Sequence, residues 1–292
     1  MPAKRLFIPD DVSAPYSPQD NNIRLLQYNN SSTTENFDAF LTHHALVYIL
    51  SGVKQIKVAH STFSINPGEL FLIPRGEYVM SEYIAGEHGF QSIMLFFNQK
   101  VARYVADGLE KRMPHVQSEV KKKEAIKIIP KNPEIRELYR SLIAYSTGNS
   151  PFLAEIIHLK FMELIYMLLD SPYQKVILSF LLDAARYEQP TLSSVLELYL
   201  YSPLTVDKLA KLSGRSLSNF KREFSQKYGD SPKKWIRKKK LEHAAFLLDT
   251  SDKSIEEISA DCGFVSSTHF ARLFKEYYST TPTEYRAKQI ES

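Results

Sequence analysis

The sequence predicts an α+β protein of two domains, in which a β-rich half is followed by an all-helical half. The length of 292 residues is typical of two domains. Short apolar segments separated by turn residues fill residues 37–97. A helical segment beyond residue 190 occurs twice. We place the boundary after residue 186, which gives domains 1–186 and 187–292.

The first half begins with residues 1–36, which are polar and rich in proline and predict a loose arm with one strand at 23–28. The segment HALVYIL at 44–50 is typical of a buried strand. Further strand patterns occupy residues 53–60, 62–65, 68–84 and 89–97. Short strands between turns such as Asn66-Pro67-Gly68 predict a small β-barrel or sandwich, whose mouth can hold a small ligand.

Helices follow the strands. Residues 101–113 predict a short helix, and AIKII at 125–129 predicts a strand. A helical region at about 133–186 is predicted to hold three helices, at 133–147, 152–169 and 174–186. Their apolar surface exceeds what one amphipathic helix needs, so they pack on the barrel or on a second copy of the chain. Residues 187–190 form the predicted linker.

The second half contains an internal duplication, which relates Thr205–Trp235 to Ser254–Tyr285. Each copy reads as helix, Gly-containing turn and helix, which is the helix-turn-helix pattern. A basic, apolar helix at 231–251 joins the copies and predicts a rigid spacer. Matching pairs include Val206 with Ile255, Gly214 with Gly263, Phe220 with Phe270, Arg222 with Arg272, Phe224 with Phe274 and Trp235 with Tyr285.

The charge distribution favours a polyanionic partner for this half. The chain has a net charge of +4, and residues 190–292 hold 17 Lys and Arg against 13 Asp and Glu. Residues 1–189 are balanced at 20 of each. The basic excess therefore lies in the duplicated half, although runs of Lys and Arg are also found on ordinary solvated faces.

The second helix of each repeat, at 216–228 and 266–278, is the predicted reader of a DNA major groove. Each turns apolar residues inward and leaves long donors and short polar side chains outside. An ordinary exposed helix face is the alternative, but both copies retain an arginine at equivalent places. The predicted DNA-binding residues are Ser218, Asn219, Lys221, Arg222, Ser267, Thr268, His269, Arg272 and Lys275.

The segment IEEISADCGFVSSTHFARLFKEYYSTTPTEYR at 255–286 resembles the signature of AraC/XylS transcription regulators. Ser259 stands where alanine is usual, Ser279 where glycine is usual, and Thr268 where serine is common. The resemblance implies that the second helices enter successive major grooves. It assigns base contacts to Ser218, Lys221, Arg222, Ser267, Thr268 and Arg272, and phosphate or flanking contacts to Asn219, His269 and Lys275.

The first half resembles the cupin-type sensor domain of the same family through NPGELFLIPRG at 66–76. More narrowly, residues 49–79 look like regulators of type III secretion genes, in which a partner protein can control activity. Ligand-binding candidates in this cupin-like barrel are aromatic and basic side chains that serve equally well as core. They are Tyr48, Phe71, Arg75, Tyr78 and Phe96.

An enzyme is not expected, and neither a catalytic residue, a metal nor a cofactor is predicted. Cupin metal sites need histidines at alternate strand positions, whereas His43 and His44 are adjacent and face opposite sides. His60, His88 and His115 are scattered. A cupin enzyme fused to a DNA-binding domain is the rival interpretation.

Other sequence features concern the chain as a whole. The single cysteine, Cys262, rules out an internal disulfide and is expected to be a buried thiol. Because the chain has no uninterrupted apolar stretch of ~18 residues, a membrane span is not expected. The start of the chain has no signal-peptide core, which predicts a cytoplasmic protein.

Together these features predict a sequence-specific DNA-binding transcription regulator, an activator that recruits RNA polymerase to double-stranded DNA. The N-terminal domain is expected to sense a small-molecule effector or to form a homodimer. Control by a regulatory protein, with no small-molecule ligand, is the alternative.

Overall fold

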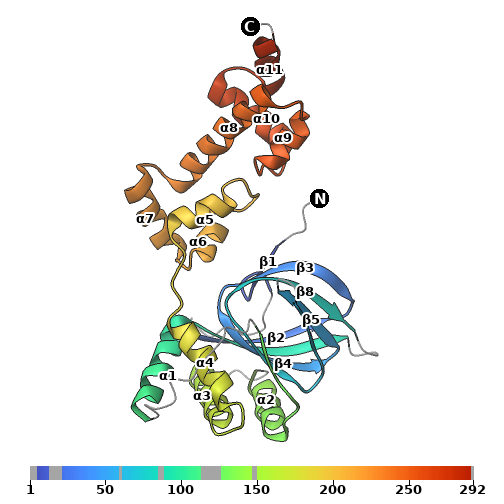
Figure 1. Cartoon of the computed structure of the whole chain (residues 1–292), viewed down its shortest axis with the longest axis vertical. Coiled ribbons are helices and arrows are strands. Elements are labelled where there is room, and N and C mark those ends of the chain that lie inside the picture. The colour runs from blue at the N-terminus through green and yellow to red at the C-terminus, as the bar shows by residue number, and fades with distance from the viewer. Residues whose placement is uncertain are drawn as a thin grey trace. The chain divides into compact units, whose positions relative to one another are not determined.

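The computed structural model describes residues 5–12, 22–58, 61–84, 89–112, 126–146 and 150–290. The chain divides into two compact units, Met1–Tyr187 and Glu188–Ser292, coloured from blue to yellow and from yellow to red in Figure 1. Each unit contains its own hydrophobic core. The two units are therefore described separately.

Two sheets form the N-terminal unit, and each has five strands within the described residues. Their strand orders are β1-β3-β8-β5-β6 and β10-β7-β4-β9-β2. Neighbours are antiparallel except β1 and β3. The strands are β1 (Leu6–Ile8), β2 (Ile23–Asn30), β3 (Thr34–Leu41), β4 (His44–Ser51), β5 (Val53–Val58), β6 (Ser61–Ile65), β7 (Leu70–Ile73), β8 (Gly76–Tyr83), β9 (Phe90–Phe97) and β10 (Lys127–Ile129).

The second sheet is buried on both faces, which explains why its central strands are almost continuously apolar. Side chains alternate along a strand, so Val47 and Ile49 of β4 join the core between the sheets. Leu46 and Tyr48 of the same strand join the core beneath the helices. A sheet covered on both faces needs apolar residues at every position.

The strands predicted at 23–28 and 44–50 are confirmed as parts of β2 and β4. The loose arm predicted for residues 1–36 is wrong for β1 and for the start of β3. The strand β3 reads as polar because its first half is largely exposed, and its pairing with β8 holds it in place. Of the two predicted alternatives, barrel or sandwich, the pairing within the described residues gives two separate sheets.

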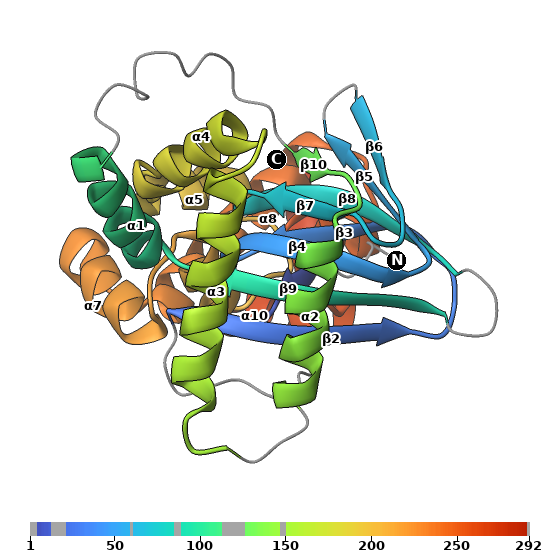
Figure 2. The ribbon, with the colours of Figure 1, turned by 90° about the horizontal axis from the view of Figure 1, so that it is seen from below.

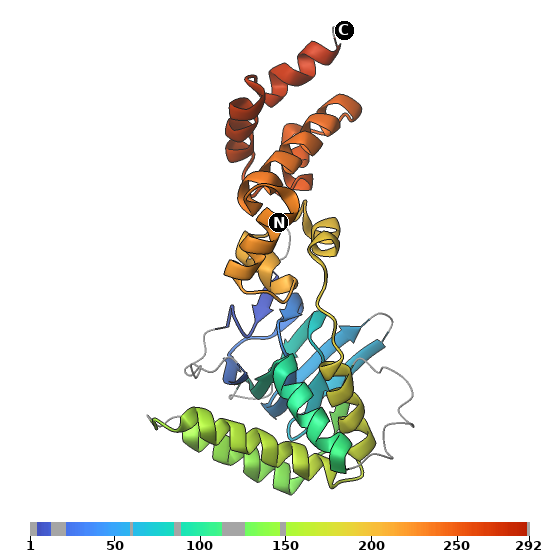
Figure 3. The ribbon, with the colours of Figure 1, turned by 90° about the vertical axis from the view of Figure 1, so that its left-hand side faces the viewer.

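Four helices follow the strands and cover the outer face of the second sheet. Figure 2 shows α2 and α3 crossing β7, β4, β9 and β2, and Figure 3 shows the two helices side by side. Tyr139, Phe161 and Ile165 are fully buried beneath them. The predicted helical region is thus confirmed and lies on the sheet. The helices are α1 (Gln99–Arg112), α2 (Pro133–Ser146), α3 (Leu153–Leu169) and α4 (Gln174–Ala185).

The C-terminal unit is entirely helical. Its longest helix, α8, follows Ser231 and has Pro232 in its first turn, within the helix predicted at 231–251. Leu241, Ala245 and Leu248 are buried along α8. The helices are α5 (Leu192–Tyr199), α6 (Val206–Leu212), α7 (Leu217–Tyr228), α8 (Pro232–Thr250), α9 (Ile255–Asp261), α10 (Ser267–Tyr278) and α11 (Pro282–Ile290). In the part of the chain that the structure describes, no helix is both long and apolar enough to cross a bilayer.

Candidate DNA-binding interface

The two repeats fold into two helix-turn-helix units, α6–α7 and α9–α10, on either side of α8. Both first helices start at a side-chain cap: Thr205 accepts a hydrogen bond from the Lys208 N–H, and Ser254 accepts one from the Glu257 N–H. Both turns contain a glycine at positive φ, Gly214 at +73° and Gly263 at +69°. The local sequence therefore specifies the same motif twice.

The inner face of each second helix is anchored by an equivalent set of aromatic rings. In the first repeat, Phe224 packs against Tyr228 and Trp235, with ring centroids 4.5 Å and 5.6 Å away. In the second, Phe274 packs against Tyr278 and Tyr285 at 4.6 Å and 5.4 Å. These contacts fix the rotation of α7 and α10 about their axes, and thus determine which side chains face outward.

The predicted DNA-binding residues all lie on α7 and α10, and all are exposed except Ser267, which is half-buried. Arg222 and Arg272 occupy equivalent positions on the two helices. Neither makes a hydrogen bond or an ion pair with any residue that the structure describes. Both guanidinium groups are therefore available to a ligand outside the protein.

Val265 is an interface candidate that the sequence analysis missed. It lies in the turn before α10 and is 88% exposed, more than any other exposed large hydrophobic residue of the described chain. It is also next to Ser266, the N-cap of α10. The second repeat is one residue longer between Gly263 and Phe270 than the first is between Gly214 and Phe220. This insertion was the signal that could have indicated Val265.

Lys240 differs from most of the basic residues of α8, because it faces the protein interior. Its side chain is buried, and Nζ donates hydrogen bonds to the carbonyl oxygens of Ser202 (2.8 Å) and Gly263 (2.9 Å). Burial lowers the pKa of Lys240 to about 8. This lysine therefore joins the α5–α6 connection, just before the first helix-turn-helix unit, to the turn of the second unit.

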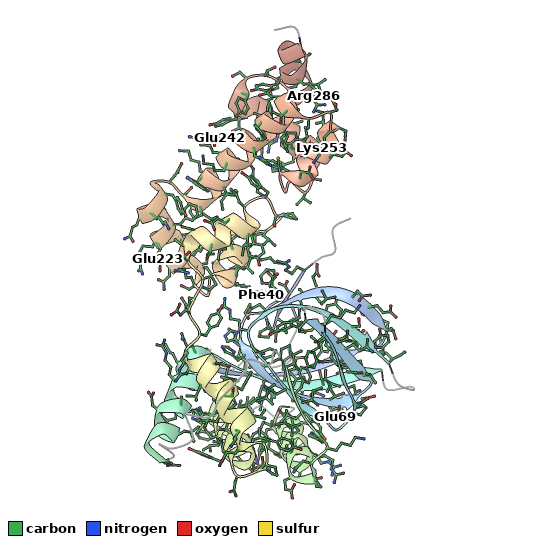
Figure 4. The ribbon with its side chains drawn as sticks, viewed as in Figure 1. Phe40, Glu69, Glu223, Glu242, Lys253 and Arg286 are labelled. Atoms are coloured by element: carbon green, nitrogen blue, oxygen red, sulfur yellow. The ribbon has the colours of Figure 1, made fainter. Side chains whose placement is uncertain are left out.

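The rest of the basic run in α8 is partly neutralised. Lys234 pairs with Asp230 (3.4 Å), and Lys239 pairs with Glu242 (2.8 Å), which is labelled in Figure 4. Exposed pairs of this kind are weak and can exchange for a phosphate contact.

Gly263 meets the backbone of the α5–α6 connection at very short range. A Cβ atom at this position would lie 2.2 Å from the Tyr201 carbonyl oxygen, so glycine is the residue that fits. The neighbouring Cys262 is fully buried, and this burial raises the pKa of its thiol to about 12. Cys262 therefore has the packing role that the sequence predicts.

The five ligand candidates of the N-terminal unit do not share one pocket. Phe71 and Phe96 line the space between the sheets, where the free volume is only about 20 Å³. Tyr78 donates its hydroxyl to the Pro74 carbonyl, and Arg75 lies over the rings of Phe40 and Tyr187. Figure 4 labels Phe40 at this end of the sheets. Tyr48 lines a groove beside α2, described below.

The adjacent histidines at the start of β4, His43 and His44, are largely buried and neutral. Burial lowers the pKa of both His43 and His44 to about 4. The described residues contain no group of His, Cys, Asp or Glu suited to hold a metal ion. The predicted scattered histidines, His60, His88 and His115, lie outside the described residues.

Comparison with known proteins relates each of the two units to a known protein domain. Residues 44–180 match the model of the "ExsA N-terminal regulatory domain", and residues 209–288 match that of a "Helix-turn-helix domain" of AraC type. The chain belongs to the AraC/XylS family. This AraC/XylS protein is a sequence-specific DNA-binding transcription regulator and not an enzyme.

Several curated AraC/XylS regulators are similar to the chain. The regulator ExsA of Pseudomonas aeruginosa is 26% identical over 245 residues, which are 82% of this chain and 85% of ExsA. The virulence regulon transcriptional activator VirF of Yersinia enterocolitica is 23% identical over 84% of this chain and 89% of VirF. The xylose operon regulatory protein of Escherichia coli is 40% identical over 28% of this chain and 21% of that protein.

Two solved structures are also similar. ToxT of Vibrio cholerae has 12% identity, covers 91% of this chain and 98% of its own, and gives a TM-score of 0.43. The DNA-binding domain of AdpA in complex with a target DNA has 30% identity, covers 35% of this chain and 93% of its own, and gives a TM-score of 0.33.

Proposed function

We propose that this AraC/XylS protein is an activator that places α7 and α10 in two successive major grooves and recruits RNA polymerase. The observation that supports this is the pair of equivalent, exposed arginines on two identically anchored helices. Arginine is suited to bind guanine through two parallel hydrogen bonds in the major groove. As a regulator of transcription, the protein is proposed to act on DNA in the cytoplasm.

The remaining polar residues of the two helices have complementary proposed roles. The residues near the amino ends of the helices are proposed to contact bases, because docked recognition helices meet the bases there. They are Ser218, Lys221, Ser267 and Thr268. The other exposed donors are proposed to contact phosphates or flanking bases. They are Asn219, His269 and Lys275. Phosphate contacts position a protein on DNA without reading sequence.

Replacing either arginine tests the base contacts. Arg222→Ala and Arg272→Ala are each expected to lose ~1–3 kcal/mol of discrimination between the target promoter fragment and a scrambled one. Fluorescence anisotropy at fixed salt measures both affinities. Gln226→Ala, another exposed position of α7, is the matched control and should bind both fragments as the wild type does.

The same assay distinguishes contacts that recognise bases from contacts that only position the protein on DNA. Lys275→Ala is expected to weaken binding to both fragments alike and to reduce the slope of log K against log salt by about one. If both arginine variants kept the discrimination of the wild type, the assignment of the recognition residues would be wrong.

We assign Val265 an apolar contact with a thymine methyl group, because an aliphatic side chain at the amino end of a recognition helix can meet that group. Replacing the contacted thymine with uracil removes only the methyl group. Uracil substitution should weaken wild-type binding several-fold at one position and leave Val265→Ala unaffected there. An equal loss in both proteins would contradict the contact.

For the N-terminal unit, the nearly filled space between the sheets supports control by protein contacts rather than by a ligand inside the sheets. One such contact is a homodimer through α3. The N-cap residue Phe152 and the α3 residues Leu159 and Tyr166 lie seven residues apart, and their exposed fractions are 67%, 67% and 45%. A stripe with this period is suited to pack against a second helix.

A further inference from the structure

A groove on the outside of the N-terminal unit lies between the end of β4, the β6–β7 turn and the start of α2. Its volume is about 470 Å³, within the range of small-molecule sites. Leu50, Pro67 and Ile143 contribute apolar surface to it. Figure 4 labels Glu69, which follows the turn residue Gly68 at the edge of this groove. The groove is separate from the filled space between the sheets.

Tyr48 lies in this groove with an unused hydroxyl. The residue is only 4% exposed, and its ring stacks on Tyr139 with centroids 4.8 Å apart and planes at 14°. The hydroxyl makes no hydrogen bond with any described residue. Burial raises the pKa of Tyr48, so at neutral pH the group is a hydrogen-bond donor. Because Tyr48 lines the groove, its hydroxyl can donate a hydrogen bond to a ligand that lies there.

Three cationic side chains line the same groove: Lys131, Arg136 and Arg140. Both arginines donate to the single carboxylate of Glu137, at 3.2 Å and 3.4 Å. These pairs are exposed, so a ligand can displace them at little cost. The surroundings of the groove therefore carry an excess of positive charge.

Two local features add to this preference for an anion. The groove includes Asn132, which caps α2 by accepting a hydrogen bond from the Ile135 N–H (2.8 Å), so the positive end of the helix dipole lies beside it. The Glu69 carboxylate is occupied within its own turn, where it accepts a hydrogen bond from the Asn66 N–H (2.7 Å).

We propose that this groove binds a small molecule with an oxyanion, a carboxylate or a phosphate, on an apolar body. The oxyanion accepts a hydrogen bond from the Tyr48 hydroxyl and pairs with Arg136 and Arg140. The apolar body lies against Leu50 and Ile143. The N-terminal unit would thus bind a small-molecule effector outside the two sheets. This proposal does not depend on the proposed DNA contacts.

Ligand-observed saturation-transfer NMR on the full-length protein tests the site with four probes: 2-naphthoate, 2-naphthyl phosphate, the neutral 2-naphthalenemethanol and inorganic phosphate. One or both naphthyl anions are expected to bind, and the neutral alcohol is expected to bind far more weakly. The preferred anion identifies carboxylate or phosphate as the head group. Binding of the alcohol as tight as that of the anions would overturn the proposal.

Variants locate the binding in the groove. Tyr48→Phe keeps the stacked ring and is expected to weaken the preferred anion by about three- to tenfold, the effect of one hydrogen bond. Arg136→Gln with Arg140→Gln should abolish binding. Arg112→Gln, which removes the arginine at the end of α1 that lies over the Tyr166 ring, is the matched control and should bind normally. Unchanged binding in the groove variants would refute the site.

A macromolecular ligand is the competing outcome. If a hexaglutamate peptide bound and neither naphthyl anion did, the groove would be a contact for an acidic protein segment and the small-molecule proposal would be wrong. Far-UV circular dichroism of each variant shows whether it is folded before its binding is interpreted.

Discussion

Ser279 and Gly229 end the two recognition helices in the same left-handed conformation, with φ of +62° and +72°. Only one of them is a glycine. A side chain in this conformation costs ~1 kcal/mol, because Cβ crowds the following carbonyl oxygen. Ser279→Gly is therefore expected to stabilise the C-terminal unit by about 1 kcal/mol against urea.

The first repeat supplies the reverse experiment. No atom lies within 4 Å of a Cβ built on Gly229, so Gly229→Ser introduces only the conformational cost. It should destabilise the unit by about the amount that Ser279→Gly stabilises it. Trp235, the single tryptophan, reports the unfolding of this unit by fluorescence. Equal stability of wild type and Ser279→Gly would contradict the argument.

Lys240 makes the stability of the C-terminal unit depend on pH. Its pKa falls from 10.5 to about 8 on folding, chiefly through burial. Between these values the unfolded chain holds a proton that the folded chain has released, so raising the pH favours folding. Lys240→Met lacks this contribution. The stability advantage of the wild type over Lys240→Met should therefore grow between about pH 8 and about pH 10.

Urea titrations followed by Trp235 fluorescence at both ends of this pH window measure that difference. Other titrating groups are common to both proteins and cancel. If the two stabilities changed in parallel with pH, Lys240 would not titrate in this window.

Residue by residue, the sequence predicts exposure well and specific polar contacts poorly. The outward positions of α7 and α10 follow from helical periodicity around Phe220 and Phe270. Lys240 was missed because it lies in a run of lysines that reads as one basic face. Its position four residues from both Ile236 and Ala244, each buried, was the available signal.

At the scale of elements, the turn of the second helix-turn-helix is the most constrained segment. Gly263→Ala would place a Cβ 2.2 Å from the Tyr201 carbonyl oxygen in addition to the cost of positive φ. A loss of about 3 kcal/mol or more is expected, because the obstacle is backbone and cannot rotate away. Gly229→Ala, which has positive φ but open space, should lose only about 1 kcal/mol.

Helices and strands could be predicted where burial of one face gives the sequence a regular spacing of apolar residues. The strands of the doubly covered sheet and the helices α2, α3 and α8 have strong apolar patterns, and the sequence places them correctly. The strands β1 and β3 have no such pattern, because their neighbours in the sheet determine their positions. The groove beside α2 could not be predicted from the sequence either, because it brings Tyr48 together with residues more than eighty positions away.

At the scale of the whole molecule, the α3 stripe predicts the oligomeric state. Leu159→Arg places a charge in the middle of the exposed stripe without touching the core. If the stripe is the homodimer contact, this variant should sediment as a monomer at concentrations where the wild type is a dimer. Lys160→Gln, the adjacent position outside the stripe, is the control and should sediment as the wild type does. If the wild type were a monomer at high concentration, the proposed homodimer through α3 would be wrong.

Lys240 contacts the turn of the second repeat and the connection just before the first repeat, and this restricts the spacing of the promoter. Grooves on one face of the duplex recur every ~10–10.5 base pairs, so each inserted base pair turns the second half-site by about 35°. A protein whose two reading units were loosely tethered could follow that rotation. In this protein the carbonyl oxygens of Ser202 and Gly263 share one ammonium group, so we expect promoters to tolerate changes within a half-site far better than a single inserted base pair between the half-sites.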